Sequence, residues 1–590
     1  MSELLVHKIV RQLFKLKSCP KLYSRLASSS VEKGRQLESL NTNGNNIHGS
    51  KKDISKGPSL EHFIANTVSP YVLDNKVKKD EAAVPFIKDD DLLGLGRKVY
   101  FDVYGCQMNV SDTEIAWAVL QDKGFVRTSD ITQADVVMVM TCAIREGAEH
   151  KVWKKLHYLA KMKRRKMSRG VGPQMKIAIL GCMAERLKTQ ILEREQLVDI
   201  VCGPDAYRDL PRLLAITENR QAAVNVLLSL EETYADVMPV RLNQDSVTAY
   251  VSIMRGCDNM CAYCIVPFTR GRERSRPIDS ILEEVRMLSD QGVKEITLLG
   301  QNVNSYRDTS DSQHFGLPDL SIKPTLSDGF RTVYRARSGG RRFSDLLDKV
   351  SQVDPEMRIR FTAPHPKDFP DEVIELIKDR PTVCGQLHLP AQSGNDDVLS
   401  FMRRGYTGQA YRQLVDRVRS ILPNVCLTSD FICGFCGESE AAFEDTLALV
   451  RDVQYSMVFA YPYSMRQKTH AYHKLIDDVP ADIKQARVEQ LQQEFRRGAG
   501  ERNKSLLGHN HLVLVQGPSK KGTGTLFGRN DGGLGVIFPD TEVTDGQTMR
   551  KPEPGDYIVV RITNSTAQTL HGEGVEISSI QRFNGQADSQ

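Results

Sequence analysis

Residues 255–277 read RGCDNMCAYCIVPFTRGRERSRP, and their three cysteines, Cys257, Cys261 and Cys264, have the spacing C-x3-C-x2-C. Thiolates are the usual protein ligands of iron–sulfur clusters, and a four-iron cluster normally takes four of them. A loop with three cysteines can therefore wrap one face of such a cluster and leave one iron without a protein ligand. An open iron of this kind is a place where a cluster can bind a substrate.

Zinc is the competing metal for this triplet of cysteines. A structural zinc site takes four protein ligands, and no fourth cysteine or histidine lies within residues 256–268. Zinc would need a distant fourth ligand, so the ligand count favours an iron–sulfur cluster.

Three further cysteines stand far apart in the sequence, yet each follows a short apolar run. The runs KVYFDVYGC, DVVMVMTC and KIAILGC end at Cys106, Cys142 and Cys182. Because parallel strands bring their carboxyl ends to one rim, where ligands bind, we expect these three cysteines to lie together. The alternative is three buried structural cysteines, which their shared position makes the weaker interpretation. Two open sites in one chain suggest an enzyme that cleaves a cofactor at one site and handles a group at the other.

The chain has 590 residues, enough for several domains. In the first, residues 96–235, apolar runs alternate with helical segments, which predicts a doubly wound parallel sheet. The expected strands are 98–104, 135–141, 176–180 and 199–201. In the second, residues 245–500, six strand–helix units predict a partial, open (β/α)6 version of the eightfold barrel. Its expected strands are 250–254, 295–301, 358–362, 386–390, 426–432 and 458–464.

The third domain, residues 505–580, has short alternating runs at 511–515, 535–538 and 557–562 with many glycines. This pattern predicts a small antiparallel β-barrel, so the fold class is α/β with a terminal barrel. Residues 307–342 interrupt the second domain with a long polar stretch, which we interpret as an inserted loop.

The first 30 residues carry six Lys/Arg against one acidic residue, with leucines at helical spacing and a serine run. This composition is typical of a mitochondrial transit peptide, although a solvated basic tail would look similar. Residues 31–95 are polar and predict a flexible linker. Without residues 1–30 the formal net charge falls from +5 to about zero, so global charge gives no argument for nucleic acid. No apolar stretch is long enough to cross a bilayer.

Several motifs together resemble the MiaB family of radical S-adenosylmethionine methylthiotransferases over roughly residues 98–580. They are YGCQMNVSD, LGCMAER, the quoted stretch at 255–277, LLGQNVNSY, LHLPAQSGND and MRRGYT. The resemblance is strongest to the animal mitochondrial members of the family. It implies two 4Fe–4S clusters, S-adenosylmethionine as cofactor, and a terminal barrel of the RNA-binding TRAM kind.

The resemblance also implies roles for particular residues. The triplet at Cys257, Cys261 and Cys264 would hold the cluster that splits S-adenosylmethionine into methionine and a 5′-deoxyadenosyl radical. The set at Cys106, Cys142 and Cys182 would hold the auxiliary cluster. The radical would act on C2 of N6-isopentenyladenosine at position 37 of tRNA and give the 2-methylthio product. The reaction would need an electron donor, which the sequence does not identify.

Four residues fall in motifs that face S-adenosylmethionine in relatives: Tyr263, Asn302, Gln392 and Ser393. Tyr263 matches an aromatic position near the adenine. Packing or helix capping would explain the other three equally well.

The sequence leaves other functions open. The same chemistry could act on threonylcarbamoyl-adenosine in tRNA or on an aspartate of a ribosomal protein. A third interpretation is a non-catalytic partner of a cyclin-dependent kinase activator subunit, which would not require two sets of three cysteines.

Some residues have a functional and a structural interpretation. Cys433 and Cys436 form a C-x2-C that could be redox-active, but buried packing is favoured for them and for Cys202. Residues 151–169 hold nine Lys/Arg and no acid, which suits either RNA phosphate or a solvated helix face. The arginines at 270, 272, 274 and 276 could bind tRNA phosphate or brace the barrel through ion pairs.

Overall fold

The protein is described here by a computed structural model covering residues 71–73, 87–144, 146–169, 174–218, 221–310, 330, 339–520 and 522–587. The expected targeting segment, residues 1–30, lies outside the described residues. Across the residues that are described, no helix combines the length and the apolar character needed to span a bilayer.

The first domain is built on one seven-stranded sheet in the order β1-β7-β6-β5-β4-β2-β3, parallel except for β1. The four expected strands are present as β2 (Lys98–Val103), β4 (Val136–Thr141), β5 (Lys176–Gly181) and β6 (Ile200–Cys202). Three short strands were not expected: β1 (Tyr71–Leu73), β3 (Val126–Arg127) and β7 (Ala222–Asn225). Of these, β1 lies within residues 31–95, the segment interpreted as a linker, and pairs with β7.

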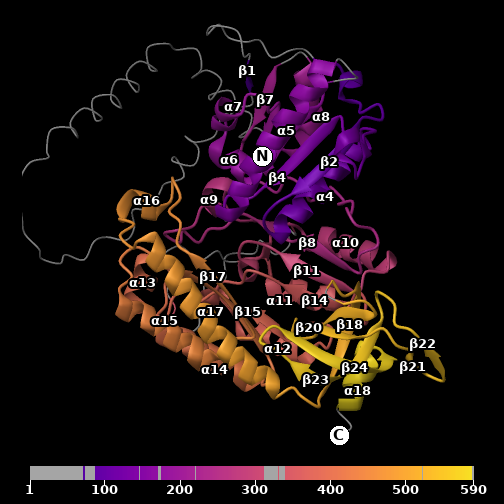
Figure 1. Ribbon diagram of the computed structural model, residues 1–590, viewed down its shortest axis with the longest axis vertical. Helices are drawn as coiled ribbons and strands as arrows, with labels where there is room; N and C mark the ends of the chain where they lie inside the picture. The colour runs from indigo at the N-terminus through magenta and orange to yellow at the C-terminus, as the bar shows by residue number, and fades with distance from the viewer. Residues whose placement is uncertain are drawn as a thin grey trace, which may run out of the picture. The chain divides into compact units, whose positions relative to one another are not determined.

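Helices cover both faces of this sheet, which explains why its central strands are continuously apolar (Figure 1). In β4, Met138 and Met140 pack against α4 (Gln107–Asp122) and α8 (Leu210–Glu218). On the other face, Val137 and Val139 pack against α5 (Glu146–Arg169) and α7 (Gln190–Arg194). Since β2 is followed along the chain by β3 on one side and then by β4 on the other, the carboxyl ends of β2 and β4 flank a topological switch point, where ligands bind in such sheets.

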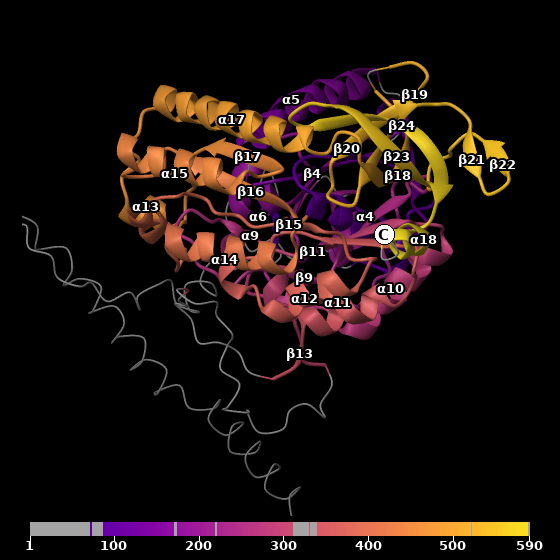
Figure 2. The same cartoon turned by 90° about the horizontal axis from the view of Figure 1, so that it is seen from below.

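The second domain is the expected partial barrel. Its six main strands are β8 (Thr248–Ser252), β11 (Glu295–Leu299), β14 (Arg358–Phe361), β15 (Gln386–His388), β16 (Cys426–Cys433) and β17 (Met457–Pro462). They form two parallel sheets of three strands, joined by a parallel bridge between Ile359 and Val383. The outer helices are α10 (Ile278–Asp290), α11 (Phe343–Ser351), α12 (Asp371–Asp379), α14 (Gly408–Ile421), α15 (Glu440–Val453) and α17 (Ala481–Lys504) (Figure 2).

The expected insertion begins and ends in a short antiparallel pair, β12 (Arg307–Asp308) with β13 (Arg341–Arg342). Most of the chain between these strands lies outside the described residues. Phe330, which is described, packs in the barrel core and against Tyr406.

The third domain is a closed barrel of β18 (Asn510–Pro518), β19 (Thr525–Asn530), β20 (Gly535–Pro539), β23 (Tyr557–Ser565) and β24 (Thr569–Ser578). Its neighbouring strands are antiparallel, as expected, but β20 pairs with β24 in parallel and closes the barrel. The sequence did not predict β19 and β24, because glycine and polar residues interrupt their apolar alternation.

Arginines at the amino-terminal edge of the partial barrel hold the third domain. Arg358 donates from Nη2 to the carbonyl oxygen of Leu512 at 2.7 Å. Arg360 donates from Nη2 to the carbonyl of Asn530 at 2.8 Å and from Nε to the Glu295 carboxylate at 2.9 Å. The terminal barrel thus docks at the end opposite to the loop that carries the cysteine triplet.

Replacing Arg360 by Met should destabilise the protein by about 3–5 kcal/mol, because Glu295 would keep a buried charge without its partner. Arg380→Met is the matched control, since Arg380 pairs with Asp348 at a half-exposed position and should cost about 0–1 kcal/mol. The measurement is urea unfolding of both variants. Equal losses of stability would contradict this account of the docking contact.

Candidate active site

The cysteine triplet follows the first barrel strand, as expected. After β8, the short strand β9 (Met254–Arg255) pairs with β10 (Arg274–Ser275), and the loop between them carries Cys257, Cys261 and Cys264. The three thiols lie close enough to influence one another: burial and then the other two cysteines raise the pKa of Cys257. Burial and Cys261 also raise the pKa of Cys264, to about 12. Ionised thiolates here need a compensating cation, which metal ions would supply.

Glycine is required immediately before this triplet. Gly256 has φ +76°, and a Cβ added there would lie on the carbonyl oxygen of Arg272. The amide N–H of Cys257 donates to the carbonyl of Gly271 at 3.3 Å, so the two ends of the loop touch. The loop is thus closed by backbone contacts that leave no room for a side chain.

The structure brings Cys106, Cys142 and Cys182 together at one rim of the first sheet. Cys106 precedes α4 as its N-cap, Cys142 follows β4, and Cys182 begins α6 (Cys182–Leu187). A side-chain hydrogen bond from Cys142, together with the charge of Arg270, lowers the pKa of Cys106 to about 6 despite burial. Burial raises the pKa of Cys182, while Arg270 acts in the opposite direction. A Cβ at Gly105 would lie 2.5 Å from that of Cys142, so the close approach of these two loops depends on glycine.

The two cysteine sites lie on the two sides of one domain interface. Helix α6 packs against α9 (Val266–Thr269), the helix that follows the triplet, and Figure 1 shows them side by side. Cys182 contacts Ile265 in a small apolar cluster with Ala143 and Phe268. Ile265 is adjacent to Cys264, so the apolar contact joins one set of thiols to the other.

The donor chemistry fits iron–sulfur clusters better than zinc. Three thiols lie near one another at each site, and backbone N–H groups of Ile144 and Asn259 donate to the sulfurs of Cys142 and Cys257, each at 3.4 Å. Among the described residues, no three or more His, Cys, Asp or Glu side chains are placed to hold a single metal ion. In a four-iron cluster each thiolate binds a different iron, so its ligands need not converge on one point.

A buried ion-pair network connects the two sites. Asp112, on α4, accepts from Arg255 Nη1 and from Arg270 Nη2, each at 2.7 Å. Burial alone would raise the pKa of Asp112, but Arg270 and Arg255 hold that pKa below its usual range. The carboxylate is therefore ionised and joins both ends of the triplet loop to the helix that starts at Cys106.

The arginines after the triplet are thus bracing residues. Arg274 pairs with Asp205 at 2.9 Å and Arg276 with Glu284 at 2.6 Å, both buried. Arg272 is more exposed and pairs with Asp258 at 3.3 Å. Of the two interpretations left open by the sequence, the structure confirms ion pairing.

The predicted S-adenosylmethionine contacts are placed at carboxyl ends of barrel strands. Asn302 follows β11, and its Oδ1 accepts from the amide N–H of His365 at 3.0 Å. Gln392 has φ +70° and pairs through its backbone with β16. Ser393 lies 3.2 Å from Thr446, hydroxyl to hydroxyl. These contacts give each residue a structural role, and their role toward the cofactor stays a prediction.

Tyr263 is joined to the triplet by a residue that sequence reasoning missed. Arg404 Nη1 lies 3.4 Å from both the Tyr263 hydroxyl and Cys261 Sγ. Its Nη2 donates to the carbonyl of Pro390 at 2.9 Å. The only sequence signal for Arg404 was its place in the motif MRRGYT.

The remaining cysteines with open interpretations are all buried. Cys202, Cys433 and Cys436 are 0%, 1% and 4% exposed and belong to apolar clusters. Burial raises the pKa of each thiol. This burial agrees with the packing interpretation.

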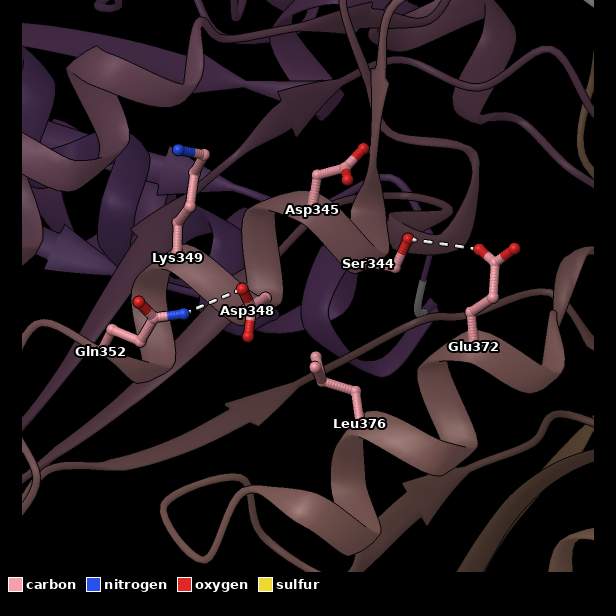
Figure 3. Close-up of a pocket in the computed structure, with 7 residues that line it drawn as sticks. All are labelled: Ser344, Asp345, Asp348, Lys349, Gln352, Glu372 and Leu376. Atoms are coloured by element: carbon pink, nitrogen blue, oxygen red, sulfur yellow. Dashed lines mark hydrogen bonds between the residues drawn. The ribbon is translucent and has the colours of Figure 1, made fainter.

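A surface hollow of about 470 Å³ lies between α11 and α12 (Figure 3). Three carboxylates and one lysine are among its lining residues, which are Ser344, Asp345, Asp348, Lys349, Gln352, Glu372 and Leu376. None of these residues belongs to a cysteine loop, and the acidic surface would repel RNA. The hollow is therefore not the candidate active site.

Three protein families match the chain in the order of its domains. The uncharacterized protein family UPF0004 matches residues 98–203, the radical SAM superfamily residues 251–450, and the TRAM domain residues 504–575. These matches agree with the parallel-sheet domain, the partial barrel and the terminal barrel.

The chain is also similar to curated proteins over most of its length. It is 55% identical to mitochondrial tRNA methylthiotransferase CDK5RAP1 of Mus musculus, over 88% of each chain. The Homo sapiens protein of the same name is 54% identical over 89% of each chain. The tRNA-2-methylthio-N(6)-dimethylallyladenosine synthase of Chloroherpeton thalassium is 42% identical, over 81% of this chain and 96% of its own.

Replacing Gly256 by Ala should lower both stability and bound iron, because the new Cβ adds a backbone clash to a strained φ. We expect a loss of at least about 1–3 kcal/mol. Gly292→Ala is the control: its φ is +79°, but nothing lies within 4 Å of an added Cβ. The two variants are compared by thermal unfolding and iron analysis. Equal iron in both would contradict the assigned role of Gly256.

Proposed function

The chain belongs to the radical S-adenosylmethionine methylthiotransferase family, and on this premise we propose that it adds a methylthio group to C2 of N6-isopentenyladenosine at position 37 of mitochondrial tRNAs. The observation that carries the proposal is the placement of two sets of three thiols on the two sides of one interface. Membership of the radical S-adenosylmethionine superfamily implies this cofactor and a 4Fe–4S cluster. A second cluster, on Cys106, Cys142 and Cys182, is part of the proposal.

At the first site, the chain binds and shields the reactive groups. Cys257, Cys261 and Cys264 are the proposed ligands, and the cluster when bound supplies the electron that divides S-adenosylmethionine into methionine and a 5′-deoxyadenosyl radical. Arg404 holds Cys261 and Tyr263 through Nη1, so the ring has a fixed position beside the triplet. Phe435 packs edge-on against Tyr263 with ring centroids 6.3 Å apart and helps to exclude water.

At the second site, the chain would hold the proposed second cluster, which carries the sulfur, close to the first site. Cys142 and Cys182 are 1% and 3% exposed, so ligands here are protected from solvent. Ile265 and Phe268, from the loop of the first site, pack in one apolar cluster with Cys182. A substrate base that enters between the domains would meet both sites without leaving the protein.

Two agreeing observations support the proposed mitochondrial location. The mouse and human relatives are named as mitochondrial tRNA methylthiotransferases. The first 30 residues have the composition of a transit peptide. The partners of the proposed reaction are the isopentenylated tRNA and an electron donor. A role limited to binding a kinase activator does not account for two sets of three neighbouring thiols.

Replacing Cys257 by Ala should abolish cleavage of S-adenosylmethionine, because the first cluster loses a ligand. Replacing Cys142 by Ala should spare that cleavage and block the 2-methylthio product, because only the second cluster is lost. Cleavage is measured as 5′-deoxyadenosine released by the purified variants. The modified nucleoside is measured by mass spectrometry of mitochondrial and cytosolic tRNA from cells expressing each variant.

Buried Cys202 packs in an apolar cluster that holds none of the six proposed ligands, and gives the matched control Cys202→Ala, which should retain both activities. A Cys142 variant that still forms 2-methylthio-N6-isopentenyladenosine would refute the second cluster. An unchanged tRNA profile in cells lacking the gene would refute the substrate.

Helix α5 offers a surface for tRNA phosphate. Lys155 and Lys163 are used internally, in ion pairs with Asp102 and Asp199. Lys161 and Arg165, one helical turn apart, are exposed. The helix therefore presents cations to solvent beyond those that it uses for its own packing.

Replacing Lys161 and Arg165 together by Gln should weaken tRNA binding and lower the slope of log K against log salt by about 1.5, since each lost phosphate contact removes about 0.7–0.9. The control replaces exposed Lys349 and Lys378, near the acidic hollow, by Gln. Binding is titrated at several salt concentrations. An unchanged slope for the α5 variant would show that this helix face is only solvated.

A further inference from the structure

Arg270 reaches across the domain interface from the first site to the second. It is the C-cap of α9, 3% exposed, and belongs to the partial barrel. Its Nη2 donates to Asp112 at 2.7 Å and to Asn109 Oδ1 at 3.3 Å. Both acceptors are on α4, the helix capped by Cys106. The guanidinium is thus held in place by the helix whose start carries one of the second-site thiols.

The other terminal nitrogen of Arg270 has no nitrogen or oxygen partner among the described residues. Nη1 is buried and makes no hydrogen bond within the described part of the chain. A buried N–H of a charged group is costly to leave without an acceptor. Arg270 also borders the second site: its acceptor Asn109 is three residues from Cys106, and Ile265, five residues before Arg270, packs in one apolar cluster with Cys182. The unpartnered nitrogen therefore belongs to a group that borders two of the three second-site thiols.

The arrangement of its terminal nitrogens distinguishes Arg270 from the nearby Arg274. Arg274 also leaves one nitrogen, Nε, without a partner. Its terminal nitrogens, however, form a fork on both oxygens of Asp205, at 2.9 and 3.0 Å. Asp205 therefore binds both terminal nitrogens of Arg274. In Arg270, by contrast, one terminal nitrogen binds Asp112 and the other lies beside the thiols.

We propose that Arg270 is a positioning residue of the second site, which donates from Nη1 to a sulfur of the cluster on Cys106, Cys142 and Cys182 and makes that cluster easier to reduce. The inference rests on the proposed function. Reduction adds one negative charge to a cluster, and a fixed cation in a buried site stabilises the more negative state. Hydrogen bonds to cluster sulfurs and local charge are established determinants of reduction potential.

The test uses the full chain with Cys257, Cys261 and Cys264 all replaced by Ala, so that only the second site can hold iron. In this background Arg270→Gln removes the charge with little change in size. We expect about four irons to remain and the equilibrium constant for reduction to fall at least tenfold, about 59 mV for one electron. The readout is a redox titration followed by electron paramagnetic resonance.

Two further variants separate positioning from a general structural role. Arg270→Lys keeps the charge and should restore part of the potential. Arg274→Gln removes an equally buried interface arginine away from the thiols and should leave the potential unchanged. If Arg270→Gln loses its iron, the Arg270→Lys variant provides the test. Iron retained in Arg270→Lys, at a potential shifted from that of the background protein, supports the proposal. Iron lost from both Arg270→Lys and Arg274→Gln overturns it.

Other outcomes overturn the proposal in distinguishable ways. Four irons with an unchanged potential in Arg270→Gln would refute the role of Arg270 and leave the second cluster standing. The same potential shift in Arg274→Gln would also refute it, by showing a general loosening of the interface. An iron-free background protein would refute the second cluster itself, and the role of Arg270 with it.

Discussion

The buried carboxylate of Asp112 is the interaction on which the candidate active site depends. Its two oxygens accept from Arg255 and Arg270, which lie on either side of the cysteine triplet in the sequence. A buried charge is costly unless it is paired. The side chains of Asp112, Arg255 and Arg270 must therefore become buried together. Asp112 also belongs to the helix that starts at Cys106. One carboxylate therefore fixes the loop of the first site against the helix of the second.

Around this contact, the carboxyl ends of the parallel strands of the first domain and those of the barrel strands face one interface. Ligands normally bind at that end of a doubly wound sheet and of a barrel. Here the two binding ends share one interface, where Cys182 touches Ile265. A reaction that needs a radical from one site and sulfur from the other gains from this arrangement, because the substrate does not have to move between separate pockets. The terminal barrel docks at the opposite end of β14, through Arg358 and Arg360, so it does not obstruct the interface.

The sequence predicts those features that depend on local pattern. Continuous apolar runs predicted the strands β2, β4, β5 and β6. The rule that parallel strands end at one rim predicted that Cys106, Cys142 and Cys182 lie together. Short or glycine-interrupted strands such as β1, β7, β19 and β24 were missed, because pairing with neighbours stabilises them more than their own residues do. The pairing of Asp112 with Arg255 was also invisible, since the two residues are 143 positions apart. For the same reason the arginines after the triplet could not be assigned before the fold was known.

The most direct test of the account is the electron paramagnetic resonance spectrum of the fully reduced, anaerobically purified protein, compared with spectra of two variants that each lack one set of three cysteines. The account predicts about eight irons in the full protein and about four in each variant. It also predicts that the spectrum of the full protein differs from the sum of the two variant spectra, because clusters on the two sides of one interface couple magnetically. Four irons in the full protein, or a spectrum equal to that sum, would contradict two clusters acting across a shared interface.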